Sequence, residues 1–323
     1  SKEDRPEDLE KIPVLKREDI SRKIAPVFNE EKQAAGVPMI FHEIETNGIG
    51  YLDLLFDMSG VPEELLPYVG ILQATLGVID TTHYEYGELF NEINVHTGGI
   101  GTSLELYPDV TKVKEKAFRA TFEIKTKALY EKLPVAFAMM AEILTESKLT
   151  DEKRLLEILE MLKSRLLMRF QSAGHTTAVL RAMAYASPSA RLKDLTGGIE
   201  FYRVVSRITD HYEEEKKDLV RKLGALAKRL FRADNLMISY TAAAEGLAGI
   251  EEQVKDLKEK LFTEPVEPQA CILHCEKKNE GFKTASKVQY VARAGNFIDQ
   301  GASYTGALQI LKVIMSYEYL WQN

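Results

Sequence analysis

The chain has little cysteine and no long apolar run, and each absence narrows its class. Its 323 residues include two cysteines, Cys271 and Cys275, which excludes a disulfide framework and is weak evidence for a reducing compartment. No apolar run approaches the roughly 18 residues needed to cross a bilayer. Residues 1–34 are rich in charge and lack a signal-peptide core. We therefore expect no membrane partner.

Basic residues are also fewer than acidic residues. Lys and Arg together number 42 against 49 Asp and Glu, which gives a net charge of -7. A protein that binds a phosphate backbone normally carries a basic excess, so nucleic acid is not an expected partner. Hydrophobic residues make up 45% of the chain and charged residues 28%, which is ordinary for a globular protein and excludes a disordered one.

The motifs of common enzyme classes are missing as well. A zinc peptidase of the HExxH or HxxEH type needs two histidines and a glutamate base on one helical face, and neither pattern occurs. After His42-Glu43, Thr46 stands where HExxH requires its second histidine. The patterns GxGxxG, P-loop and GxSxG are absent too. Residue patterns alone therefore indicate no catalytic centre.

Two groups of potential metal ligands occur in the sequence. The run from Cys271 through His274 to Cys275 brings potential ligands together, but zinc sites usually pair such a cluster with a second one. We favour a strand with small buried thiols. His83 and His96 show no carboxylate partner in helical phase, and we expect them on the surface or satisfied in the core.

The N-terminal half predicts both strands and helices. Residues 1–34 are predicted to be an extended or partly helical arm, or alternatively a disordered tail. Residues 38–42 and 49–58 flank an Asn47-Gly48 turn and predict a β-hairpin. The other elements predicted here are helices at 62–81 and 84–95 and strands at 101–107 and 117–125. The last strand alternates apolar and polar residues, which predicts one buried and one weakly covered face.

The C-terminal half predicts mainly helices. We expect helices at 133–145, 151–186, 199–211, 213–232 and 244–262, with a strand at 235–241. Thr263–Gln269 contains two prolines and two glutamates and predicts a linker. After it we expect a strand at 287–292, a loop at 294–304 and a helix at 306–321. The fold class is α+β, an antiparallel-rich mixed sheet with helices packed on one face.

This element order also predicts the domain organisation. We assign 1–34 to a linker arm, 35–262 to the main domain, and 263–323 to a linker and the N-terminal part of a second such domain. The residues after the linker are too few for a comfortable independent core. The chain begins with Ser1 rather than Met and stops just after an apolar helix. We therefore expect a processed protein or a truncated piece of a longer one.

Several segments taken together resemble one family. His42–Asp57 resembles the opening of the third domain of presequence protease-type enzymes, a branch of the insulinase (pitrilysin) zinc metallopeptidases. The helix at 62–81 and the segment from Tyr84 to Ile100, with its Thr-Gly-Gly-Ile ending, are similar to the next segments of that domain. Tyr304–Ala307 and Ser316–Trp321 resemble the start of the fourth domain. These segments occur in the same order as in the family, and the ordered set is more specific than any single segment.

The resemblance spans about residues 8–323 and implies a fold and an activity for the parent protein. It implies four homologous domains of the mitochondrial processing peptidase-like type, in two halves that close around a chamber and degrade unstructured peptides. The zinc and its HxxEH helix would lie in the first domain, where zinc activates a water and the glutamate is the general base. This chain would be the non-catalytic third domain and the beginning of the fourth.

The same resemblance implies that no site residue lies in this chain. Aligning the zinc helix with the helix at 62–81 places Ile71-Leu72-Gln73-Ala74-Thr75 where the active domain has HxxEH, without a ligand or a base. The family's substrate-binding Arg and Tyr would fall beyond residue 323. Catalytic, cofactor-binding and metal residues are therefore all predicted as none, with zinc held by the missing N-terminal half.

The implied partners are peptide substrates and the N-terminal half of the same chain. The implied location is the bacterial cytoplasm, or an organelle for a eukaryotic member, and the chain alone is predicted to be inactive. One alternative is a standalone non-catalytic binding or structural protein with a degenerate peptidase fold. Another is an unrelated helical scaffold, which helices at 49–58 and 117–125 would favour.

Overall fold

One mixed sheet organises the computed structural model, which describes Arg5, Glu7 and residues 11–23, 26–284 and 288–319. Within these residues the strand order is β1-β2-β6-β3-β5-β4, and all neighbours pair antiparallel except β2 and β6. The strands are β1 (Glu30–Ala34), β2 (Val37–Glu43), β3 (Ile49–Asp57), β4 (Ile100–Pro108), β5 (Phe118–Leu129) and β6 (Leu236–Ala242). The α+β class with an antiparallel-rich sheet is confirmed.

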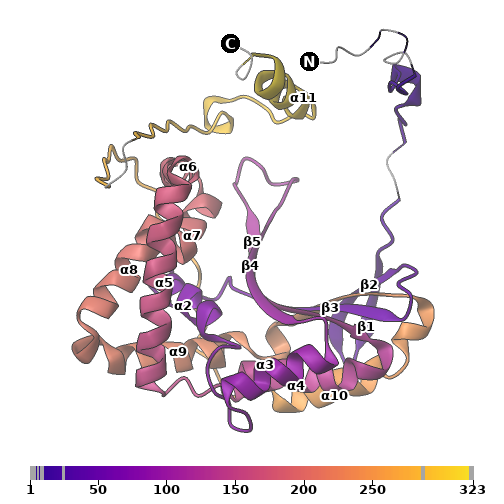
Figure 1. Cartoon of the computed structure of the whole chain (residues 1–323), viewed down its shortest axis with the longest axis vertical. Helices are drawn as coiled ribbons and strands as arrows, with labels where there is room; N and C mark the ends of the chain where they lie inside the picture. The colour runs from indigo at the N-terminus through magenta and orange to yellow at the C-terminus, as the bar shows by residue number, and fades with distance from the viewer. Residues whose placement is uncertain (1–4, 6, 8–10, 24–25, 285–287, 320–323) are drawn as a thin grey trace.

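Helices cover one face of this sheet and continue as a block beside it (Figure 1). Those along the sheet are α3 (Tyr86–His96), α4 (Leu133–Thr145) and α10 (Ile250–Lys260). Those of the block are α2 (Leu66–Thr75), α5 (Glu152–Ser172), α6 (Gly174–Ala184), α7 (Pro188–Gly197), α8 (Ile199–Asp210) and α9 (Tyr212–Leu230). A separate helix, α11 (Ala307–Ile314), follows a long irregular segment. No helix in the described part of the chain is long and apolar enough to span a bilayer.

Alternation along β5 explains why the sheet has one covered face. Phe122 and Ile124 are fully buried under the helices, while Arg119, Lys125 and Lys127 point to the opposite side. Successive side chains of a strand alternate between faces, so one stretch of sequence supplies both the core and a polar outer surface. The predicted buried face and weakly covered face of this strand are both present.

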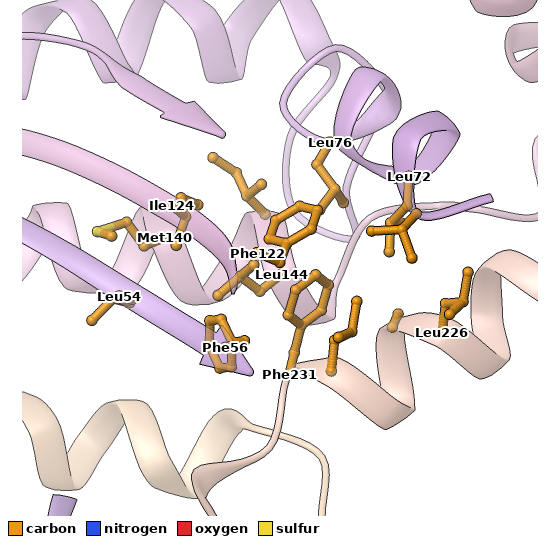
Figure 2. Close-up of a cluster of buried hydrophobic side chains, with 14 of the residues drawn as sticks. Leu54, Phe56, Leu72, Leu76, Phe122, Ile124, Met140, Leu144, Leu226 and Phe231 are labelled. Atoms are coloured by element: carbon orange, nitrogen blue, oxygen red, sulfur yellow. The ribbon is translucent and has the colours of Figure 1, made fainter. Parts of the chain in front are cut away.

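Three aromatic rings join the sheet to the helical block. Phe231, which follows α9, packs edge to face against Phe56 of β3 and Phe122 of β5, with ring centroids 5.2 Å apart in each pair. All three side chains are fully buried, and they lie at the centre of the core (Figure 2). Edge-to-face pairs at this spacing add to the stabilisation from apolar burial.

The strands at the start of the sheet differ from the predicted hairpin. Asn47 and Gly48 do adopt positive φ, 51° and 79°, as predicted for the turn. β2 and β3 are nevertheless not paired with each other, because β6 lies between them, parallel to β2 and antiparallel to β3. A local turn signal cannot show that a strand almost two hundred residues later enters the sheet. Residues 30–34, assigned to the arm, form edge strand β1.

The helical predictions hold with corrections at the breaks. The helix at 133–145 has the predicted bounds, and the Asp151 carboxylate caps α5 by accepting the Arg154 N–H at 2.9 Å. The long helix predicted at 151–186 is instead two, because the chain turns at Ala173, with φ -131° and ψ 44°. The helix predicted at 62–81 ends at Thr75.

Beyond the linker, the predicted strand is wrong and the predicted helix is only partly confirmed. Residues 263–284 contain no strand, and neither do 288–292, although the sequence predicts a strand at 287–292; Lys287 itself lies outside the described residues. The helix predicted at 306–321 is α11 followed by a π-helical turn, Met315–Tyr319, and residues 320–323 lie outside the described part. The domain boundaries remain a prediction.

We predict that Phe231→Ala destabilises the fold by about 3–5 kcal/mol, because it removes a ring that contacts two others and leaves a cavity. Urea denaturation followed by circular dichroism measures this. Phe90→Ala is the matched control, since that ring is 62% exposed, and a surface change should stay within about 0.5 kcal/mol. Equal effects for the two variants would contradict the central role of Phe231.

Candidate functional site

The helix aligned with the family's zinc helix is α2, and its inner face carries apolar side chains. The positions aligned with the two histidines and the glutamate of HxxEH hold Ile71, Thr75 and Ala74. Ile71 and Thr75 are fully buried. The only hydroxyl among them, on Thr75, donates to the Ile71 carbonyl at 2.8 Å. These three positions therefore present no imidazole or carboxylate to a metal.

Two reciprocal hydrogen bonds join α2 to edge strand β4. The Gln73 side-chain amide donates to the Thr102 carbonyl at 3.2 Å, and the Thr102 hydroxyl donates to the Gln73 carbonyl at 3.0 Å. Edge strands expose unpaired backbone groups that an added strand can use. At Thr102 the carbonyl is already taken by Gln73, so α2 occupies the edge at this point.

Gly70 of α2 approaches the helical block closely. A Cβ atom on Gly70 would lie 2.6 Å from the Thr196 carbonyl oxygen of α7 and 2.7 Å from the Phe201 ring of α8. Real Cβ atoms do not approach backbone this closely, so glycine permits the contact. Because it contacts β4 as well as α7 and α8, α2 is the joint between the sheet and the helical block.

The open face of the sheet carries a polar cluster centred on Glu123 of β5. The Glu123 side chain is fully buried although it faces away from the core. Its Oε1 accepts hydrogen bonds from the Tyr107 and Thr121 hydroxyls, each at 2.6 Å. Its Oε2 lies 2.8 Å from Lys125 Nζ without ideal hydrogen-bond geometry, so this contact is mainly electrostatic. The buried negative charge is compensated on both oxygens.

Two further carboxylates extend the cluster across the neighbouring strands. Lys125 Nζ lies 3.8 Å from Glu105 of β4 and 4.0 Å from Asp53 of β3. Burial raises the pKa of Asp53, with Lys125 opposing that shift. Burial lowers the pKa of Lys125, but the close contact with the Glu123 carboxylate outweighs it, so the net shift is upward. Burial and the hydrogen bond to Glu123 also raise the pKa of Tyr107.

These shifts limit the chemistry that the cluster can perform. A general acid or base works best with a pKa near the operating pH. The phenol of Tyr107 and the ammonium of Lys125 are both moved further from neutrality, so each retains its proton. The cluster is therefore suited to holding β3, β4 and β5 together and to presenting a hydrated surface. Sequence alternation identified its face, but not the burial of Glu123.

The histidines and cysteines considered as candidate ligands are dispersed. His42 Nδ1 lies 3.0 Å from the Phe28 carbonyl oxygen. His96 Nε2 lies 3.4 Å from Glu92, one helical turn earlier, so the expectation of no carboxylate partner in helical phase is wrong for His96. His83 Nδ1 lies 2.9 Å from Glu142, a partner from a distant part of the chain. Among the described residues no three His, Cys, Asp or Glu side chains are grouped as they would be around a metal ion.

The Cys271–Cys275 run also differs from the predicted buried strand. It is irregular backbone, with Cys271 partly buried and Cys275 exposed. The His274 imidazole contacts Glu63, with Nδ1 2.8 Å from Oε2. Burial raises the pKa of both thiols. The thiols are thus not activated as nucleophiles, because the thiolate is the reactive form.

Comparison with known proteins identifies the family. Residues 1–208 match the family described as peptidase M16 subfamily C associated. Because this match spans more than half of the chain, the protein belongs to that family. The resemblance to a presequence protease-type, C-terminal-half segment of the insulinase family is thereby confirmed.

Related proteins agree with this assignment. The chain is 34% identical over 318 residues to "Protein HypA" of Clostridium perfringens (strain 13 / Type A), covering 98% of this chain and 32% of that protein. It is 24% identical over 325 residues to "Presequence protease 1, chloroplastic/mitochondrial" of Arabidopsis thaliana, covering 99% of this chain and 29% of that one. The chain thus spans about a third of these relatives.

A solved structure shares the fold. The peptidase M16 inactive domain from Pseudomonas fluorescens aligns with a TM-score of 0.50 and 15% identity, over 75% of this chain and 53% of that chain. Similarity at this level of identity shows the fold alone.

We predict that Gly70→Ala destabilises the chain by about 1–3 kcal/mol, because the added methyl group meets backbone and ring atoms that cannot both move aside. Chemical denaturation measures the change. Gly87→Ala in α3 is the control, since no atom lies within 4 Å of the position that a Cβ would take there, and Ala should be neutral or slightly stabilising at that site. Tolerance of Gly70→Ala would show that α2 is less tightly packed than described.

We predict that Tyr107→Phe destabilises the fold by about 1.5 kcal/mol, because it removes a hydrogen bond to a buried charged group. Tyr51→Phe on the same face is the control, since Tyr51 is 44% exposed. Thermal and urea unfolding of the two variants supply the comparison. A Tyr107→Phe variant as stable as the unaltered chain would mean that Thr121 and Lys125 compensate Glu123 by themselves.

Proposed function

We propose that this chain is the non-catalytic third domain and the beginning of the fourth domain of a zinc metalloendopeptidase that degrades unstructured peptides within a chamber. The main support is α2, whose positions aligned with the zinc ligands and base hold Ile71, Thr75 and Ala74. Family membership supplies the context in which that loss is meaningful, because a zinc hydrolase needs its ligands and base elsewhere. Zinc would then be held by the N-terminal half.

The open sheet face fits the role of a chamber wall. It bears charged and hydroxyl side chains, including Glu105 and Glu123, both of which lie close to Lys125. Such a face can border water and an extended peptide without presenting a large apolar surface. In this proposal the wall excludes folded proteins by geometry, while hydrolysis occurs at the zinc of the opposite half.

Exposed apolar residues on α11 favour this proposal over a standalone binding protein. Ile310 is 65% exposed, Val313 55% and Tyr317, in the following turn, 69%. An apolar helical surface of this kind normally packs against another surface. The remainder of a fourth domain would provide it. For the location we propose the bacterial cytoplasm, or an organelle for a eukaryotic member.

We predict that the purified chain has no peptidase activity, and that adding a separately produced N-terminal half containing HxxEH restores cleavage of an unstructured fluorogenic peptide. A folded protein of similar length should remain uncleaved in the same mixture. The matched control is an N-terminal half whose motif Glu is changed to Gln, since loss of the general base should abolish turnover. Turnover by the chain alone, or none by the two intact halves in a demonstrated complex, would contradict the proposal.

A further inference from the structure

The segment that leaves α10 is held against the helical block by side-chain contacts. We call residues 263–284 the strap. Near its start, Lys228 of α9 lies 2.6 Å from Glu264, and the Arg229 guanidinium donates to the Glu267 carbonyl at 2.9 Å. The strap is thus fixed from its beginning, although its two prolines and lack of periodic pattern predict a simple linker.

The middle of the strap is tied to the segment between β3 and α2. The Cys271 N–H donates to the Ser59 carbonyl at 2.7 Å. Oε2 of the Glu63 carboxylate accepts the backbone N–H of His274 at 3.0 Å. The other carboxylate oxygen, Oε1, accepts a hydrogen bond from Arg191 of α7 at 2.9 Å. These backbone bonds give two amide protons on the strap whose exchange with solvent reports whether it is attached.

The strongest contact is at the end of the strap, where Glu280 meets Arg181 of α6. The two groups form a two-pronged pair, with Nε to Oε2 2.7 Å and Nη2 to Oε1 3.0 Å. The Arg181 side chain is only 5% exposed. The hydrogen bonds from Arg181 hold the pKa of Glu280 at about 2, so its carboxylate is ionised at neutral pH. Forked guanidinium–carboxylate pairs combine strength with a fixed orientation.

Other groups around Arg181 belong to the block itself. Its Nη1 donates to Asp194 of α7 at 2.6 Å and to Glu200 of α8 at 3.1 Å. The guanidinium therefore keeps two carboxylate partners whether or not the strap is attached. Glu280 also accepts a hydrogen bond from the Tyr185 hydroxyl and lies 3.8 Å from Arg203. The block thus presents a preformed receptor for one carboxylate, and the strap supplies it.

The interface under the last part of the strap is polar, whereas nearer its start Cys271 and Leu273 pack against the hydrophobic core. A cavity of about 220 Å³ separates part of the strap from the helices. Side chains from both sides line it, among them Tyr185, Arg191, Arg203, His274, Glu276 and Lys278. Around this cavity charged pairs therefore provide most of the attachment.

We propose that the Arg181–Glu280 pair is a latch that holds the strap on the helical block and thereby sets the position of the downstream chain. Opening the latch exposes a carboxylate and leaves the block intact, since Asp194 and Glu200 still satisfy Arg181. Downstream of the strap, the Tyr290 ring lies 5.9 Å from that of His175 of α6, and Asp299 lies 2.9 Å from Lys116 in the loop between β4 and β5. That the residues after the strap begin a fourth domain rests on the proposed function; the latch itself does not.

Hydrogen exchange of Glu280→Gln tests the latch. We expect exchange at the Cys271 and His274 amides to accelerate by about tenfold or more, because a charge-assisted pair is replaced by neutral contacts. Amides of β5 and α4 should exchange at unchanged rates. Glu276→Gln is the matched control on the same strap, since Glu276 pairs with Lys278 at 3.0 Å and makes no described contact with the block. It should leave strap exchange unaltered.

Three results would overturn the proposal. Unchanged strap exchange in Glu280→Gln would show that the other ties suffice. Equal acceleration in Glu276→Gln would show that any loss of negative charge loosens the strap. Acceleration of the β5 amides together with the strap would show that Glu280 stabilises the whole domain. None of these measurements involves peptide hydrolysis, so they stand or fall separately from the proposed function.

Discussion

The burial of α2 is the constraint on which the rest of this structure depends. Leu66, Val69 and Leu72 are fully buried, and the helix contacts β4 as well as α5, α7, α8 and α9. A helix enclosed in this way transmits the position of the sheet edge to the whole helical block. The same enclosure prevents it from presenting ligands to solvent.

Polarity is divided accordingly between the two faces of the sheet. The helices cover the face that carries Phe56, Phe122 and Ile124, where hydrocarbon packing provides most of the stabilisation. The other face satisfies a buried carboxylate, Glu123, with a phenol, a hydroxyl and an ammonium. A buried charge left without partners would be strongly destabilising. Complete compensation is what allows a charged residue in a central position of the open face.

Several local signals in the sequence are confirmed by the structure, whereas long-range pairings are not visible in them. The Asp151 cap, the Asn47-Gly48 turn and the period-two pattern of β5 each depend on neighbouring residues, and each is confirmed. Strand order was not predictable in this way, because the insertion of β6 between β2 and β3 depends on contacts far apart in the chain.

The candidate site shows the same limit. That α2 carries no imidazole or carboxylate is evident from residue identities alone. The partners of Glu123 and Glu280 were hidden among 49 acidic residues, since pairing depends on which elements meet. The role of a carboxylate can be assigned only once the fold shows whether it is buried and which groups face it.

The chemistry of the strap contacts bears on how such a chain can move. Separating apolar surfaces exposes hydrocarbon to water, whereas the two groups of an ion pair in partial contact with water can be hydrated when they part. Arg181 lies between these limits, because its guanidinium is buried while Glu280 remains 20% exposed. The Glu280 end of the strap can therefore detach without unfolding the block, since Asp194 and Glu200 retain the buried cation. Nearer its start, where Cys271 and Leu273 pack against the core, separation would expose apolar surface. A charged attachment at the end of the strap thus keeps this segment ordered and still permits a change in its position.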